Sequence, residues 1–350
     1  MDLRPRYIAH PRPLTALFAE LASYAAAQSV AFVGTPGTVL QRQNAKGFQF
    51  YARQYYDALG KQREQYVAGP VGTAGADLTA AALRAEIEQA QAQIPDLQLL
   101  GREGFAVVDA RTWATAASLH NFGLFRAGAV LLGSHAFGVL LNQLGVRAPA
   151  YTTEDIDIGR NGPLAFDAPP TQSLLDMLNA SGIAFTALPE LDHRQPATSF
   201  GEIGRARFHV DLLAPSPTTT VSFAPVPELQ AHATTLPWLR FLLNETSLAP
   251  ILARQGCCMV RVPLPERFAL HKLMASQVRA DRYGKSAKDV EQAAVVLAVL
   301  AEHYPGAIEV ALARVPRSGL KALRGGIAQV TPLLAAHPRA LAALQLRYAV

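Results

Sequence analysis

The sequence predicts an α/β (α+β) protein with a mixed β-sheet, a small N-terminal module and a helical C-terminal region. Three observations support this prediction. From Arg126 onward short apolar strands alternate with helices, several more strand-like runs follow, and beyond Pro265 the pattern is helical. This order of elements is typical of a mixed sheet with helices packed against it.

The N-terminal module is expected to span residues 1–122. A helix is predicted over 12–28, where apolar residues recur at helical spacing. Two aromatic-rich runs flank a turn at Ala58-Leu59-Gly60, which predicts a hairpin. Helices are then predicted at about 76–94 and about 109–123.

The second part is expected to span 123–264. An apolar strand at 127–133 leads to a helix ending at Gly145, and 152–159 reads as a strand. A helix over 171–182 has Gly182 as its predicted C-terminal cap. The further predicted strands are 185–191, 206–215, 238–245 and 257–264.

The last part is expected to span 265–350 and to consist of helices. Breaks between these helices are predicted at Pro305, Pro316, Gly325-Gly326 and Pro338, because proline and glycine interrupt helical patterns.

The composition indicates a folded, water-soluble chain. Half of the 350 residues are hydrophobic and 17% are charged, so disorder is excluded. No apolar run approaches the ~18 residues of a membrane span, and the N-terminus lacks the apolar segment of a secretory signal. We therefore expect a cytoplasmic protein with no membrane partner.

The net charge indicates what kind of partner the chain can bind, and the two cysteines indicate whether it forms a disulfide. A net charge of +5 is compatible with an anionic partner such as an NTP or nucleic acid. The two cysteines, Cys257 and Cys258, are adjacent, and neighbouring cysteines seldom form an unstrained disulfide. We expect both to be small apolar members of a strand.

Three aspartates carry the strongest chemical signal. Asp155 and Asp157 alternate with apolar residues in EDIDI, so a strand would place both on one face. Asp211 lies in a second alternating run and could sit beside them in the same sheet. Converging carboxylates repel each other unless they hold cations. Hard oxygen ligands in this number suit Mg²⁺ or Mn²⁺.

A Gly-Ser pair precedes the aspartates by about twenty residues. Gly133 and Ser134 lie at the predicted turn from strand to helix, where backbone N–H groups and a hydroxyl can bind phosphate. Together with three carboxylates, this pair predicts metal-assisted nucleotidyl transfer. An isolated Asp-x-Asp also occurs in glycosyltransferases and in phosphatases.

Several residues near these in the sequence are further candidates for the site. Glu154 is predicted to point away from the aspartates as a solvated or ion-paired acid, whereas His209 shares the face of Asp211. His135 either approaches the phosphate or belongs to the capping turn. After the last strand, His271, Lys272, Arg279, Lys285 and Lys288 could supply cations to a triphosphate.

The assembled pattern resembles the DNA polymerase β-type nucleotidyltransferase superfamily. More narrowly, the aromatic hairpin from Phe48 to Pro70, the stretch FRAGAVLLGSHAFGVLLNQLG leading into TTEDIDI, and LHKLMASQVRADRYGKSAKDVEQA resemble the bacterial GSU2403-type nucleotidyltransferase-fold proteins. The resemblance implies that Asp155 and Asp157 bind two Mg²⁺ ions and that Asp211 helps to position the acceptor. It also implies phosphate binding by Gly133 and Ser134. Lys272 and Lys288 are the lysines it favours for the triphosphate, and Asp289 is expected to be an ion-pair partner.

The expected reaction is transfer of a nucleoside monophosphate from an NTP to a hydroxyl, with release of pyrophosphate. The acceptor stays open among tRNA or other RNA, a protein and a small molecule. Basic and aromatic residues interleave in the hairpin, which fits either single-stranded nucleic acid or a half-buried amphipathic hairpin. The alternatives are a nucleotide- or RNA-binding protein without turnover and an Asp-x-Asp glycosyltransferase.

Overall fold

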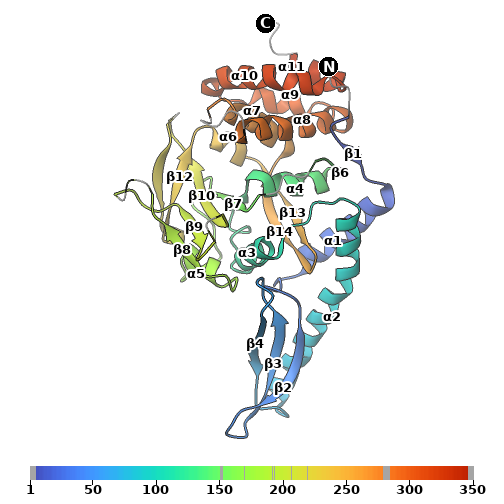
Figure 1. Cartoon of the computed structure of the whole chain (residues 1–350), viewed down its shortest axis with the longest axis vertical. Coiled ribbons are helices and arrows are strands. Elements are labelled where there is room, and N and C mark those ends of the chain that lie inside the picture. Colours follow the sequence, from blue (N-terminus) through green and yellow to red (C-terminus); the bar gives the residue numbers. More distant parts are fainter. Residues whose placement is uncertain are drawn as a thin grey trace.

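The computed structural model describes residues 5–149, 153–168, 170–190, 192, 194–205, 207–218, 220–278 and 284–345. It has three levels along its longest axis, with a small N-terminal sheet at one end and the C-terminal helices at the other (Figure 1). Between them lie the largest sheet and a long hairpin. No helix among the described residues is both long and apolar enough to cross a membrane.

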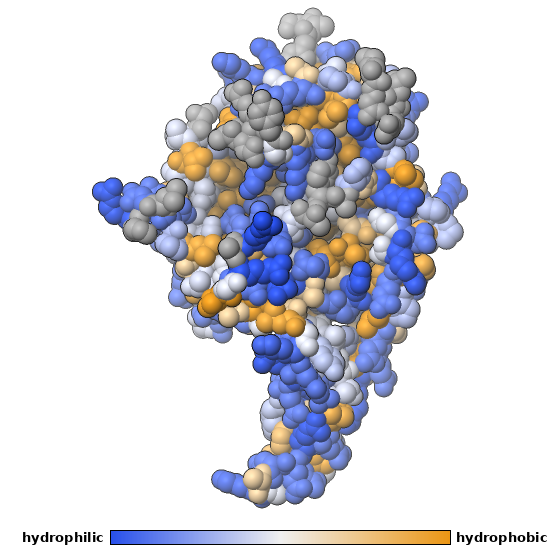
Figure 2. Space-filling view, in the orientation of Figure 1, coloured by the Kyte–Doolittle hydropathy of each residue, from blue (hydrophilic) through white to orange (hydrophobic). Residues whose placement is uncertain are grey.

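The N-terminal part is built from helices and a three-stranded antiparallel sheet. Its helices are α1 (Arg12–Ala27), α2 (Ala74–Arg102) and α3 (Ala110–Asn121). The sheet contains β2 (Thr38–Gln43), β3 (Gln49–Tyr56) and β4 (Gln62–Ala68). The hairpin predicted around Ala58–Gly60 is confirmed as β3–β4, and β2 is an additional strand. This sheet projects from the molecule and is mostly hydrophilic in Figure 2.

Helix α2 is longer than the sequence predicted, because it continues through Pro95. Leu97 and Leu100, which follow the proline, are fully buried against Phe18 and Leu21 of α1. Burial of these side chains offsets the missing proline N–H and keeps the last two turns helical.

The N-terminal hairpin buries one of its basic residues. The Arg53 guanidinium lies over the rings of Phe32 and Tyr55, at 4.5 and 4.2 Å from their centroids. It also donates hydrogen bonds to the backbone oxygens of Thr35 and Pro36. Arg53 therefore stabilises the hairpin and is not presented to solvent.

The largest sheet has seven strands, in the order β11-β12-β10-β7-β5, with β9 also paired to β10 and β8 paired to β9. Its strands are β5 (Val130–Leu131), β7 (Asp155–Gly159), β8 (Phe185–Leu188), β9 (Ser199–Glu202), β10 (His209–Pro215), β11 (Ser222–Val226) and β12 (Ala231–Leu236). β10 is parallel to both β7 and β12, whereas β5, β9 and β11 pair antiparallel to their neighbours. The predicted mixed α/β architecture is confirmed.

Two smaller antiparallel pairs complete the strands: β1 (Ile8–Ala9) with β6 (Val146–Arg147), and β13 (Thr246–Ala253) with β14 (Gly256–Pro263). Cys257 and Cys258 lie in β14, where both are free thiols and buried, as the sequence predicted.

The helices next to the large sheet are α4 (Gly133–Gln143), α5 (Leu174–Asn179) and α6 (Leu239–Leu243). The strand predicted over 238–245 is wrong, because this run forms α6 after Trp238, whose φ is 58°. Its apolar side chains are buried on all sides, so periodicity does not separate a short helix from a strand. Helix α5 ends before the predicted cap, and Gly182 takes a φ of 80° two residues beyond its C-cap.

The C-terminal part is helical, as predicted. It contains α7 (Pro265–Ala275), α8 (Lys285–His303), α9 (Ala307–Ala313), α10 (Leu320–Val330) and α11 (Pro338–Gln345). The break predicted at Gly325-Gly326 is wrong, because both glycines lie inside α10. A Cβ on Gly326 would come within 3.0 Å of the Leu273 backbone, so the glycine allows α10 to pack closely on α7.

Candidate active site

The three aspartates lie on two adjacent strands. β7 and β10 are parallel, and their register places Asp157 opposite Asp211 and Asp155 opposite His209. Ile156, between the two aspartates on β7, is buried on the other face, while the aspartates are partly exposed. The predictions that Asp155 and Asp157 share a face and that Asp211 sits beside them are confirmed.

Gly133 brings the start of α4 against the aspartates. Leu132, just before it, donates its backbone N–H to the Asp157 backbone oxygen at 2.8 Å. Gly133 has a φ of 63°, and a Cβ placed on it would come within 3.0 Å of Asp157 Oδ2. Only glycine combines this backbone conformation with so close an approach.

Ser134 connects the first turn of α4 to α8. Its Oγ accepts a hydrogen bond from Gln292 Nε2 at 3.4 Å. Because α4 begins at Gly133, the N–H groups of its first turn have no acceptor within the helix. These groups and the positive end of the helix dipole favour an anion at this position.

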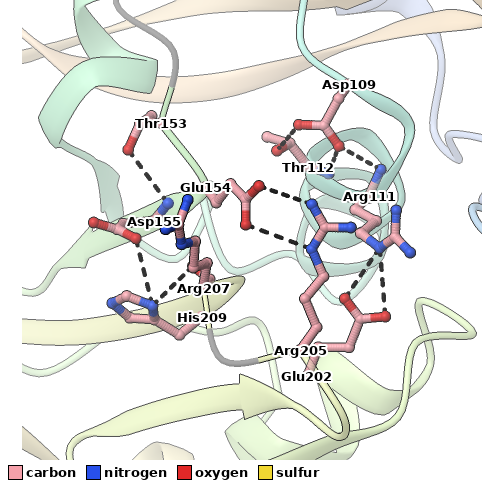
Figure 3. Close-up of polar contacts among 10 residues, drawn as sticks. All are labelled: Asp109, Arg111, Thr112, Thr153, Glu154, Asp155, Glu202, Arg205, Arg207 and His209. Carbon is pink, nitrogen blue, oxygen red and sulfur yellow. Dashed lines mark hydrogen bonds and ion pairs between the residues drawn. The ribbon is translucent and has the colours of Figure 1, made fainter.

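His209 lies between the carboxylates of Asp155 and Asp211, and Figure 3 shows it beside Asp155. Its Nδ1 is 3.4 Å from Asp155 Oδ1, and its Nε2 is 3.5 Å from Asp211 Oδ2. The hydrogen bond to Asp211, with the negative charges of Asp211 and Asp155, raises the pKa of His209 to about 9. The imidazolium thus partly neutralises the cluster at pH 7.

Asp211 is the most enclosed of the three carboxylates. Burial alone would raise the pKa of Asp211, but the hydrogen bond and charge of His209 hold it below its ordinary value. Its Oδ1 is buried and accepts no hydrogen bond. An ionised carboxylate with a buried, unsatisfied oxygen is costly unless a ligand or ion completes it.

The predicted lysines lie on α7 and α8. Lys272 is buried, and its Nζ lies 2.6 Å from Asp289 Oδ1, which confirms Asp289 as an ion-pair partner. Burial, followed by the charge of Lys272, lowers the pKa of Lys288. The Nζ of Lys285, a lysine that the sequence favoured less than Lys272 and Lys288, lies 4.0 Å from Asp155 Oδ2. Arg279 lies outside the described residues.

A polar network borders the start of β7 (Figure 3). Glu154 accepts from Arg205 at 2.7 Å, which confirms the predicted ion-paired acid. Beside it, Arg111 of α3 pairs with Glu202 at 3.0 Å. The sequence did not predict the roles of these arginines, because their partners are far away in the chain: Glu154 lies just before β7, and Glu202 lies in β9.

His135 is buried next to Ser134. Burial lowers the pKa of His135 to about 4, so the side chain is neutral at pH 7. Its Nε2 is buried and makes no hydrogen bond. His135 is the third residue of α4 and lies in its first turn, as one of the two alternatives predicted.

The donor set fits a divalent cation. Within the described residues, no three acidic, histidine or cysteine side chains already converge around one point. The parallel register nevertheless brings Asp155, Asp157 and Asp211 to one face, and the unsatisfied Asp211 Oδ1 offers a ligand. Carboxylate oxygens are the ligands that Mg²⁺ and Mn²⁺ prefer.

Comparison with known protein families shows which family the chain belongs to. A nucleotidyltransferase family matches residues 110–315, which is more than half of the sequence. This range includes α3, the large sheet, β13–β14 and helices α7 to α9. A search of curated proteins found no match.

The α/β fold with its carboxylate-bearing strands therefore belongs to a transferase. More particularly, the chain is a member of the nucleotidyltransferase family, whose members transfer nucleoside monophosphates.

Proposed function

We propose that the chain is a Mg²⁺- or Mn²⁺-dependent nucleotidyltransferase of the DNA polymerase β type, related to the GSU2403-type proteins. It moves a nucleoside monophosphate from an NTP to a hydroxyl and releases pyrophosphate. The observation that carries this proposal is the parallel register of β7 and β10, which puts Asp155, Asp157 and Asp211 on one face.

The carboxylates would hold two metal ions, with Asp155, Asp157 and Asp211 as ligands. Bound there, a divalent cation neutralises triphosphate charge and lowers the pKa of an acceptor hydroxyl. Asp211 would also take up the proton of that hydroxyl. Catalysis then rests on positioning and charge neutralisation, as in other phosphoryl transfers.

The triphosphate would bind where α4 and α8 meet. Gly133 allows the first turn of α4 to approach Asp157, and its N–H groups and Ser134 Oγ would hold phosphate oxygens. Lys288 would add positive charge from α8. Lys272 would support the nucleotide from α7, where its ion pair with Asp289 fixes α8.

The arrangement of the parts is also a proposal. Residues 1–122 would form the N-terminal module, 123–264 the catalytic domain and 265–350 the helical region, in a cytoplasmic enzyme. The family match favours nucleotidyl transfer over an Asp-x-Asp glycosyltransferase. Retention of three mutually repelling carboxylates argues against a binding protein without turnover.

The test is transfer from each of four α-³²P-labelled NTPs to RNA, protein and small-molecule fractions of a cell extract, with Mg²⁺ or Mn²⁺. The wild type runs beside Asp155→Ala/Asp157→Ala. Label that enters a fraction only with the wild type supports the proposal and names base and acceptor class. Equal labelling by both proteins, or none with any NTP, would refute it.

A further inference from the structure

A cavity of about 460 Å³ adjoins the candidate active site. It lies between α4 and the segment that joins α2 to α3, with walls from Phe105, Val107, Phe137 and Ile251. One end is lined by Ser134 and Thr153. The Oγ1 of Thr153 accepts the backbone N–H of Asp155 at 3.3 Å, so this end borders the aspartates.

The walls of this cavity are fixed by specific contacts. The buried Asn142 side chain of α4 both accepts from Ala106 N and donates to Ala106 O, each at 2.8 Å. Val108 donates its backbone N–H to Leu252 O at 2.8 Å. At Gly138 a Cβ would lie 3.0 Å from Ala106 Cβ, so the glycine lets the two walls approach. The cavity is thus preformed.

The lining is apolar except at a few defined positions. His135 lines it with a neutral imidazole whose buried Nε2 has no partner. The Asp109 carboxylate is already engaged, since it accepts from Arg111 N, Thr112 N and Thr112 Oγ1. Among the described residues that line the cavity, none is a lysine or an arginine.

We propose that this cavity binds the apolar body of a small-molecule alcohol, which is the acceptor of the transferred nucleotide. The inference rests on the proposed function and selects among its acceptors. A lining without cations does not suit a phosphodiester chain, whereas apolar walls with a few hydrogen-bonding groups are typical of small-molecule sites. The volume is about three times that of a cavity that holds benzene.

The reaction follows from this placement. The body of the alcohol lies against Phe105 and Phe137, a second polar group bonds His135 Nε2, and the hydroxyl emerges beside Thr153. The hydroxyl oxygen bonds to the α-phosphorus of the NTP as the bond from that phosphorus to the bridging oxygen breaks. Pyrophosphate leaves with the electron pair, and the hydroxyl proton passes to Asp211.

The test measures binding without turnover, by NMR of the histidine imidazoles during titration with benzyl alcohol and 2-phenylethanol. Glycerol is the polar control. Ala148→Phe places a ring at the cavity wall, and Ala187→Phe makes the same change on the exposed face of β8. His135→Phe removes the unpartnered nitrogen but keeps an apolar ring.

The proposal expects both aromatic alcohols to shift the His135 resonance, and glycerol to leave it in place. Ala148→Phe should weaken binding at least tenfold, His135→Phe about fivefold, and Ala187→Phe not at all. The proposal is wrong if folded wild type does not bind the aromatic alcohols, or if Ala148→Phe and Ala187→Phe bind them equally well. It is also wrong if a non-hydrolysable NTP displaces the alcohol. Metal-dependent NTP consumption in the same samples tests the proposed function separately.

Discussion

Replacement of Gly133 by alanine should disable the site while leaving the protein folded. The backbone at Gly133 has a φ of 63°, a conformation that costs a non-glycine residue about 1–2 kcal/mol. The new methyl carbon would also fall within 3.0 Å of Asp157 Oδ2 and 3.1 Å from its Cγ. Relief of this overlap moves the carboxylate or the first turn of α4 by roughly 1 Å, and such a displacement typically costs about 10²-fold in rate.

Gly182→Ala is the matched control for this substitution. Gly182 has a φ of 80°, but a Cβ there would meet nothing within 4 Å. Gly182→Ala should therefore lose about 1–2 kcal/mol of unfolding free energy in urea titrations, and Gly133→Ala at least as much. Only Gly133→Ala should lose nucleotidyl transfer, measured with α-³²P NTP at saturating Mg²⁺. If folded Gly133→Ala keeps transfer within threefold of Gly182→Ala, the assignment of this turn is wrong.

Three further predictions concern stability. His135 has a folded pKa of about 4, so between pH 6.5 and 4 only the unfolded chain binds its proton, and the free energy of unfolding falls by about 3 kcal/mol as pH drops. His135→Gln should show a shallower decline in urea titrations across that range, and parallel curves would contradict this. Lys272→Met leaves the buried Asp289 without this partner and should cost about 3–5 kcal/mol. Adding Asp289→Leu to Lys272→Met should recover most of the lost stability. If Lys272→Met alone is as stable as wild type, the pairing is refuted. Glu154→Ala breaks an exposed pair with Arg205 and should leave the melting temperature nearly unchanged, because solvent screens such pairs. A clear drop in melting temperature would show a structural role.

The candidate site was largely predictable because its signals are local. Alternation in EDIDI fixes the shared face of Asp155 and Asp157 once the segment is a strand. The sequence does not fix which strands are neighbours, so the alignment of Asp211 with Asp157 required the structure. The same holds for Lys272, whose partner Asp289 lies on the next helix.

The errors in the predicted fold arise where tertiary packing overrides local pattern. Pro95 does not end α2, because Leu97 and Leu100 beyond it are buried. Gly326 does not break α10, since its missing side chain is what allows contact with α7. His135 is a comparable case in the site, because only the fold shows that its ring is buried beside a cavity.

The most direct test of the central claim measures Mn²⁺ binding in the presence of a non-hydrolysable NTP. Binding is detected as the loss of the EPR signal of free Mn²⁺. The three aspartates should form the cation-binding site, so wild type should bind Mn²⁺. Asp155→Asn/Asp157→Asn should lose that binding while staying folded, and Asp211→Asn should weaken it. If the double variant binds Mn²⁺ as tightly as wild type, these carboxylates are not the metal site and the account fails.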